Sequence, residues 1–159
     1  MSVIIDGYNL LRSIQKSDEQ AELTNEIQLC RVVGRYLKIT GQTGEIIFDG
    51  TGPSGKFEFE DISNLETFFV GLSTDADTVI ENKIQASTAP KQLTIVSSDR
   101  RLRDAARKRK ATLVKSQVFW NKLQRQLSRK SKIKEPAAKR LGLTESETKQ
   151  WLKFFDLEQ

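Results

Sequence analysis

Five short apolar runs divide the chain, and segments with helical periodicity lie between most of them. The runs cover residues 3–5, 45–48, 67–70, 93–96 and 112–114. Such alternation is typical of a parallel β-sheet whose faces are covered by helices. We therefore expect an α/β fold with a central, mainly parallel sheet.

The clearest helical pattern lies between the first two apolar runs. Residues 19–38 carry apolar side chains at three- and four-residue steps, which is the spacing of one buried helix face. These side chains are Leu23, Ile27, Cys30, Val33 and Leu37. Gly41 follows as a signal for the end of the helix. Further helices are expected over 75–86, 99–110 and 116–129.

The chain is long enough for one main domain with a small appendage, and 1–129 is the predicted domain. Residues 130–143 are basic and contain Pro136, which predicts a linker. In 144–159, Thr144 and Glu147 have the spacing of a capping box ahead of an apolar stretch. A short C-terminal helix is predicted there, and the sequence does not indicate where it docks or whether the chain forms oligomers.

Composition excludes several kinds of chemistry. The 159 residues contain no histidine and one cysteine. Imidazole catalysis, an intramolecular disulfide and a clustered-thiolate zinc site are therefore ruled out, and hydrolysis would have to use carboxylates with a hard cation. No apolar stretch approaches the roughly eighteen residues of a membrane span. We expect no membrane partner and a cytoplasmic location.

Positive charge is concentrated in one part of the chain. Residues 100–140 contain sixteen Lys and Arg against two acids, a net charge of +14, whereas the whole chain carries +5. The other residues therefore carry −9. Clustered Lys and Arg favour a polyanionic partner such as a nucleic acid, and a solvated helix face with a basic linker is the alternative.

Acidic residues follow four successive apolar runs. Asp6 follows the first, Asp49 the second, Asp75 and Asp77 the third, and Asp99 the fourth. The carboxyl ends of parallel strands meet at one edge of the sheet, where α/β folds bind ligands. Gathered acids repel one another unless a cation lies among them, so the pattern predicts a divalent-metal site.

Each polar residue at this edge also has an ordinary structural explanation. Asp49 beside Gly50 suits a turn, Asn9 could cap a helix that begins after it, and these two and Asp75 are assigned structural roles when taken singly. Asp77 at a helix N-terminus and Asp99 as an N-cap are evenly balanced between structure and function. For Asp6 an ordinary structural explanation is the weakest, because Gly7-Tyr8-Asn9 does not look like a simple turn.

Four motifs in order resemble a known family. IIDGYNLL, IIFDGTGP, STDADTVIENKI and TIVSSDRRLRDAAR are similar to the motifs of NYN domains, a group of PIN-like nucleases, and especially of the YacP-like branch. The resemblance covers roughly residues 2–129. It implies a PIN-like three-layer fold, with a short C-terminal helical appendage here, and metal-dependent ribonuclease activity.

Carried over by motif, the resemblance makes Asp6, Asp77 and Asp99 ligands of Mg²⁺ or Mn²⁺ and places Asn9 beside them as part of the catalytic set. Asp49, Asp75 and Glu81 are possible accessory residues. The chain has Thr78 where the YacP-like branch often has a second adjacent acid, which leaves the number of metals open. RNA is the implied partner, and association with the ribosome is a further expectation.

The residues beside this edge fit hydrolysis of RNA by metal-activated water. Ser97 and Ser98 could orient Asp99 or contact phosphate. Basic residues beyond the site could follow the RNA backbone; these are Arg100, Arg101, Arg103, Arg107 and Lys108. A non-catalytic RNA-binding module is one alternative, favoured by Thr78. A small-molecule phosphohydrolase is another, although it would gain little from so many clustered cations.

Overall fold

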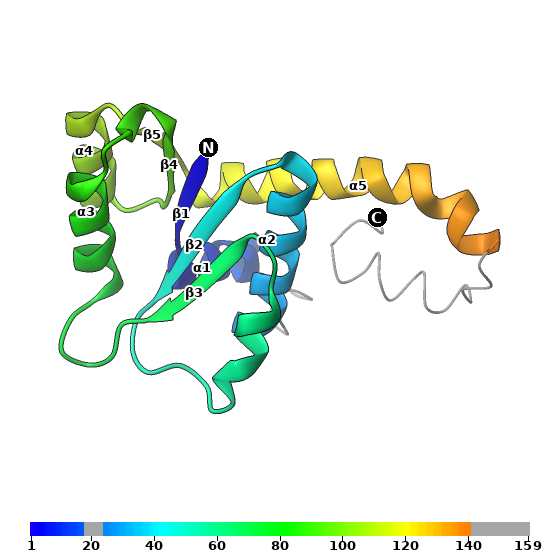
Figure 1. The fold of residues 1–159 in the computed structure, drawn as a ribbon, viewed down its shortest axis with the longest axis horizontal. Helices are drawn as coiled ribbons and strands as arrows, with labels where there is room; N and C mark the ends of the chain where they lie inside the picture. The colour runs from blue at the N-terminus through cyan, green and yellow to red at the C-terminus, as the bar shows by residue number, and fades with distance from the viewer. Residues whose placement is uncertain (18–23, 141–159) are drawn as a thin grey trace.

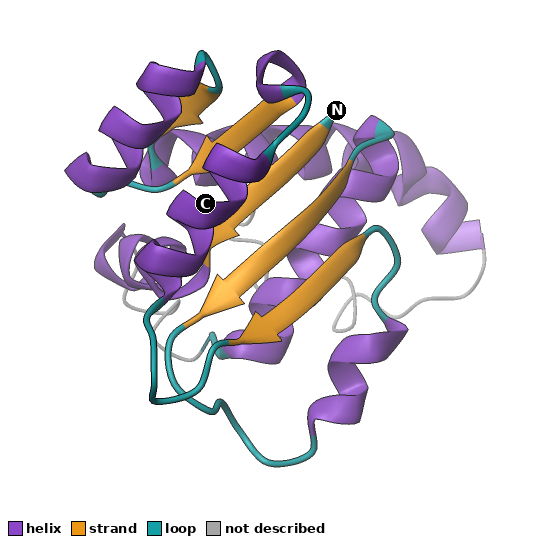
Figure 2. Ribbon diagram, turned by 60° about the vertical axis from the view of Figure 1, so that its left-hand side comes forward, coloured by secondary structure: helices purple, strands orange, loops and turns teal. Residues whose placement is uncertain are grey.

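A five-stranded parallel sheet forms the centre of the fold (Figure 2). The computed structural model describes residues 1–17 and 24–140. The strands are β1 (Ser2–Asp6), β2 (Thr43–Phe48), β3 (Leu65–Phe69), β4 (Leu93–Val96) and β5 (Thr112–Val114). Their order is β3-β2-β1-β4-β5, and every neighbouring pair runs parallel. The predicted α/β class is confirmed, with β2 and β3 beginning earlier than their apolar runs.

Helices cover both faces of the sheet and complete three layers (Figure 1). One face carries α1 (Gly7–Ser17), α2 (Glu26–Thr40) and α5 (Ser116–Arg140), and the other carries α3 (Ala76–Ala86) and α4 (Arg100–Arg109). Two short 3-10 helices, η2 (Lys56–Asp61) and η3 (Pro90–Gln92), precede β3 and β4. In the described part of the chain, no helix combines the length and apolar character that crossing a membrane requires.

The middle strand β1 contributes to both hydrophobic cores. Val3 and Ile5 belong to the cluster beneath α1, α2 and α5, whereas Ile4 belongs to the cluster beneath α3 and α4. Successive side chains of a strand point to opposite faces, so a strand covered on both sides reads as a continuous apolar run. Asp6 ends this strand and therefore lies at the centre of the carboxyl edge.

Helix α2 begins later than the sequence pattern predicts. Asn25 is its N-cap, and the backbone N–H of Gln28 donates to Asn25 Oδ1 at 3.0 Å while Gln28 Oε1 accepts from the N–H of Asn25. This reciprocal capping box fixes the first turn at Glu26, so the predicted start at 19 is wrong. Leu23 lies outside the described residues. The predicted end is confirmed, because Gly41 takes a left-handed φ of 70° after the last turn.

The start of α1 also differs from the expectation. The helix begins at Gly7, directly after β1, so Asn9 lies inside it rather than capping a later helix. The abrupt change from strand to helix brings the backbone of Gly7 against the ring of Phe48, and a Cβ at Gly7 would overlap that ring. Glycine at this position therefore allows α1 to begin immediately beside Asp6.

Helix α5 continues past the predicted end at 129 and reaches Arg140. The basic composition and Pro136 predict a linker over all of 130–143, of which 130–140 are helical and 141–143 lie outside the described residues. One proline removes a single helical hydrogen bond, and the neighbouring Lys, Arg and Ala residues favour helix, so the backbone stays helical. The C-terminal helix predicted for 144–159 lies outside the described residues.

Candidate active site at the carboxyl edge of the sheet

Asp6 is a buried acid at the end of the middle strand. The residue is only 6% exposed, and Ser97 Oγ donates a hydrogen bond to Asp6 Oδ2 at 3.2 Å. Burial and the nearby charge of Asp77 raise the pKa of Asp6 from 3.8 to about 7. A carboxyl group with such a pKa exchanges its proton near neutral pH, as many catalytic acids and bases do.

Asp77 lies in the first turn of α3 and faces Asp6. A hydrogen bond between the two carboxyl groups raises the pKa of Asp6 and lowers that of Asp77, so Asp6 carries the shared proton. The net pKa of Asp77 is still raised, first by burial and then by the charge of Asp99. Two carboxyl groups that are hydrogen-bonded to each other resist being ionised at the same time, because their negative charges repel. The pair is therefore suited to hold either a proton or a cation.

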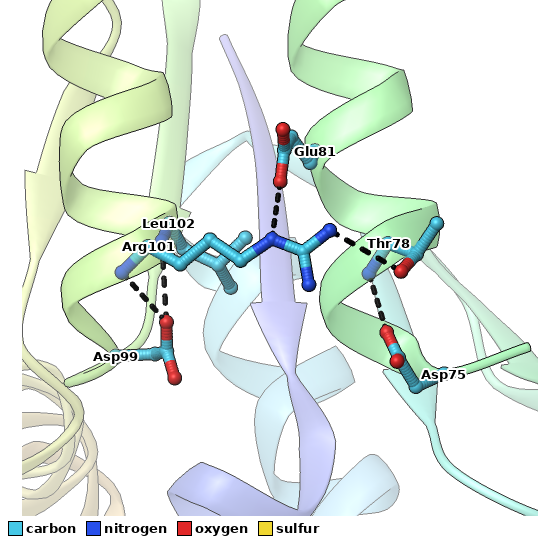
Figure 3. A network of polar contacts seen from close by, with 6 residues as sticks. All are labelled: Asp75, Thr78, Glu81, Asp99, Arg101 and Leu102. Atoms are coloured by element: carbon cyan, nitrogen blue, oxygen red, sulfur yellow. Dashed lines mark hydrogen bonds and ion pairs between the residues drawn. The ribbon is translucent and has the colours of Figure 1, made fainter.

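Asp99 combines a capping role with a place near this pair. Its Oδ1 accepts hydrogen bonds from the backbone N–H groups of Arg101 at 2.8 Å and Leu102 at 3.3 Å, and so caps α4 (Figure 3). Within the described residues, Oδ2 of Asp99 has no hydrogen-bond partner. One oxygen stabilises the helix, and the other remains available beside Asp77.

Asp49 and Asp75 have the structural roles that their local sequence indicates. Asp75 Oδ1 accepts from the backbone N–H of Thr78 at 2.7 Å and caps α3 (Figure 3). Asp49 Oδ1 accepts from the backbone N–H of Ala76 at 2.7 Å, which ties the end of β2 to the same helix start. Both charges also raise the pKa of Asp77, so these carboxylates add to the negative potential of the edge.

Asn9 links α1 to two other segments. Its Oδ1 accepts from the backbone N–H of Ser98 at 2.9 Å and from the hydroxyl of Ser116 at 2.6 Å. In turn, Ser98 Oγ accepts from the backbone N–H of Ser116 at 3.4 Å. Ser116 is fully buried and was not identified from the sequence, where it looked only like the start of a helix. These bonds hold three chain segments together beside Asp6.

Ser97 contacts both Asp6 and Asp99. Its hydroxyl oxygen accepts from the backbone N–H of Asp99 at 3.1 Å while its proton goes to Asp6. Ser97 is fully buried, so both bonds are protected from water. The residue therefore orients the carboxylate of Asp6 and fixes the backbone, rather than the side chain, of Asp99.

Glu81 lies one turn beyond Asp77 but pairs with a cation. Arg101 Nε donates to Glu81 Oε2 at 2.5 Å, and a terminal nitrogen of Arg101 donates to Thr78 Oγ1 at 3.3 Å (Figure 3). The arginine thus crosses from α4 to α3 next to the acids. Its pKa is raised by Glu81 and, to a smaller extent, by Asp75 and Asp77. Arg101 balances part of the negative charge at the edge.

The other basic residues predicted to bind RNA all lie on α4. Arg100, Arg107 and Lys108 are exposed, and Arg103 is half-buried. The N–H of Arg103 bonds to the carbonyl oxygen of Asp99 at 3.1 Å, so this side chain begins one helical turn from the acids. The helix therefore extends a row of cations away from the edge.

The acidic edge fits a hard divalent cation by its chemistry but is not a complete ligand set. Within residues 1–17 and 24–140, no three acidic or cysteine side chains are already grouped to hold a metal ion. Asp6 and Asp77 are paired, and Asp99 offers one unbonded oxygen nearby. Carboxylate oxygens are the ligands that Mg²⁺ and Mn²⁺ prefer. Of the predicted ligands, the structure brings two into direct contact and places the third beside them.

Comparisons with known proteins identify the family. Residues 3–155 match the YacP-like NYN domain. The crystal structure of Rae1 (YacP) from Bacillus subtilis has 22% identity and a TM-score of 0.68, covering 97% of this chain and 94% of that chain. A crystal structure of a Trp-to-Leu mutant of the Bacillus subtilis protein has 15% identity and a TM-score of 0.63, covering 98% and 92%. No curated protein sequence gives a significant match. The resemblance seen in the four motifs is thus confirmed, and the chain belongs to the YacP-like NYN domain family of ribonuclease-like domains.

Proposed function

We propose that this chain is an endoribonuclease that hydrolyses RNA phosphodiester bonds with the help of Mg²⁺ or Mn²⁺. The observation that carries the proposal is the pair formed by Asp6 and Asp77 at the end of the middle strand. A buried carboxyl group that shares a proton with a half-buried one is unfavourable for stability alone. Their position at the ligand-binding edge of a ribonuclease-like domain supports a catalytic role.

Asp6, Asp77 and Asp99 are the residues that would hold the cation. When bound, the cation lowers the pKa of a water molecule and stabilises negative charge on the phosphate. Ser97 orients Asp6, and Asn9 with Ser98 fixes the loop that carries Asp99. The role of these residues is to keep the carboxylates in place while the phosphate group changes its geometry.

Proton transfer must be performed without histidine, which the chain lacks. The pKa of about 7 belongs to Asp6 in the cation-free chain, so a cation that binds at neutral pH would displace the proton that Asp6 shares with Asp77, and a water molecule would have to carry the proton during the reaction. Arg101 adds a positive charge beside the same acids, where it can attract the phosphate of an approaching RNA. The remaining cations of α4 would contact the backbone of the RNA further along.

The charge distribution supports RNA, alone or in ribonucleoproteins such as the ribosome, as the partner. The net +14 between 100 and 140 suits a polyphosphate and is not needed for a small phosphorylated substrate. A cytoplasmic location is part of the proposal, because RNA is present there and the buried Cys30 is a free thiol.

A non-catalytic RNA-binding module is the second candidate function. It is favoured by the incomplete ligand set in the described residues and by the capping bonds of Asp99. Under this alternative, the acidic edge would have a structural role and the basic helix would hold RNA. Binding would then be sensitive to salt and independent of divalent cations.

Cleavage of a labelled RNA separates these candidates. The full chain is incubated with single-stranded and structured RNA in Mn²⁺ and in EDTA, together with Asp6→Asn and Asp104→Asn. Asp104 is an exposed acid of α4 and serves as the charge-matched control. Cleavage that requires Mn²⁺, is lost in Asp6→Asn and is kept in Asp104→Asn supports the nuclease. RNA that is bound but left intact by every form of the chain supports the binding module.

A further inference from the structure

A basic groove lies between α4 and β5, beside the acidic edge. It has a volume of about 540 Å³ and no acidic residue in its lining. The lining residues are Arg103, Arg107, Lys110, Ala111, Leu113 and Lys115. Four cations therefore surround one hollow, and two apolar residues form the rest of its surface.

Among the described residues, the four cations of this α4–β5 groove have no counter-ion. In the described part of the chain, no carboxylate forms an ion pair with any of them, and their side chains make no hydrogen bond. Other cations of the same helix are engaged, since Arg101 pairs with Glu81 and Arg109 donates to the carbonyl oxygen of Ser87. Like charges around a shared hollow repel one another, and a bound polyanion relieves that repulsion.

The α4–β5 groove begins near the proposed catalytic residues. Arg103 lies one turn from Asp99, and Lys115 directly precedes Ser116, which bonds to Asn9. From Arg103 to Lys110, helix α4 rises by about 10 Å. The groove thus extends from the carboxyl edge of the sheet along the β5 side, and a nucleic-acid strand crossing the edge can continue into it.

We propose that the α4–β5 groove binds the sugar–phosphate backbone of the RNA at a distance from the phosphate that is cut. This inference rests on the proposed function for the identity of the ligand. Arg103 and Arg107 present planar guanidinium groups that suit phosphate oxygens, while Lys110 and Lys115 act as point charges. The half-buried Ala111 and Leu113 offer an apolar surface to the sugars. Contacts made equally in the ground state and the transition state lower KM without changing kcat.

The test compares two double variants of the full chain with equal loss of charge. Arg107→Gln with Lys115→Gln removes two cations of the groove. Lys16→Gln with Lys38→Gln removes two exposed lysines of α1 and α2, on the opposite layer. Binding of a single-stranded oligoribonucleotide is measured in EDTA over a range of salt concentrations, and thermal unfolding verifies that each variant is folded.

The groove variant is expected to bind the RNA roughly tenfold or more weakly. The slope of log K against log salt concentration should become shallower by about 1.4, because two phosphate contacts are lost. The lysine control should bind nearly as the unchanged chain does. In Mn²⁺ the groove variant should show a higher KM and an unchanged kcat. A trinucleotide, too short to span edge and groove, should be cleaved equally by both variants.

Equal weakening of RNA binding in the two double variants would overturn the proposal that the groove binds RNA, because affinity would then follow net charge alone. Cleavage could persist in that case, so the proposed nuclease would survive. If no form of the chain cleaves RNA but only the groove variant loses RNA binding, the nuclease proposal fails and the proposed RNA-binding role of the groove is retained. Single substitutions of Arg103 and Lys115 by Gln provide a second, independent measurement of each contact.

Discussion

The carboxyl groups of Asp6 and Asp77 share a hydrogen bond although one ends β1 and the other begins α3. Folding brings them together because the sheet is parallel and both segments reach the same edge. The repulsion between the two carboxylates makes the free energy of unfolding depend on pH, which can be measured without an activity assay.

Stability should fall as the pH rises through the range in which Asp6 is protonated only in the folded chain. The pKa of Asp6 is about 7 in the fold and 3.8 ordinarily, so between these values the unfolded chain binds fewer protons. Asp6→Asn removes this penalty and keeps an oxygen that accepts from Ser97. In EDTA the variant should match the unchanged chain below about pH 4 and exceed it by a few kcal/mol above about pH 7.

Urea unfolding at several pH values measures this difference, with Asp104→Asn as the control for loss of a surface charge. A stability gain in Asp6→Asn that is the same at every pH would mean that the acid does not titrate as the structure requires.

Mn²⁺ should stabilise the folded chain at neutral pH. A cation that binds only the folded state adds about 2.7 kcal/mol at one hundred times its Kd. The effect should shrink at lower pH, where protons occupy Asp6 and compete with the cation. Thermal unfolding with and without Mn²⁺ tests this, and the stabilisation should disappear in Asp77→Asn but persist in Asp104→Asn. Equal Mn²⁺ stabilisation of all three proteins would place the cation elsewhere.

Gly7→Ala should destabilise the chain and disturb the site. The added Cβ would overlap the ring of Phe48, and overpacking of a buried contact costs about 1–3 kcal/mol. Arg12→Ala, an exposed position of α1, is the control for the substitution itself. Chemical unfolding of both variants decides the point, and a Gly7→Ala chain as stable as the control would show that Phe48 moves aside freely.

Ser116→Ala should affect both stability and turnover. It removes the hydroxyl that donates to Asn9, and a buried acceptor that loses its partner costs about 1–3 kcal/mol. Because Asn9 holds the loop of Asp99, kcat for RNA cleavage should fall more than KM changes. Ser54→Ala, at an exposed serine, should leave both unchanged. A normal kcat in Ser116→Ala would mean that Ser116 contributes to stability but not to catalysis.

Much of the fold follows from local sequence. The bounds of β4 and β5 coincide with their apolar runs, because β4 is covered on both faces and reads as a mostly apolar run, and the apolar residues of the edge strand β5 are half-buried. The edge where the acids gather also follows, since parallel strands end together. The start of α2 does not follow from the apolar stripe, because the capping pair of Asn25 and Gln28 begins the helix inside the range that the stripe predicts.

The partners of the site residues could not be read from the chain. Ser116 bonds to Asn9 from far along the sequence, and such a bond leaves no local pattern. Glu81 has helical spacing to Asp77, but the nearby α4 supplies Arg101 as its partner. The α4–β5 groove likewise depends on which face each cation of α4 occupies after packing. Local pattern predicts which elements form, whereas tertiary contacts decide what each side chain binds.

A crystal structure of the full chain, grown with Mn²⁺ and measured at the manganese absorption edge, tests directly whether the acidic edge holds a cation. We expect an anomalous peak bounded by the carboxylates of Asp6, Asp77 and Asp99, with Asp99 still capping α4 through Oδ1. Saturating Mn²⁺ that leaves no peak at this edge, with Asp6 and Asp77 still bonded to each other, would contradict this expectation.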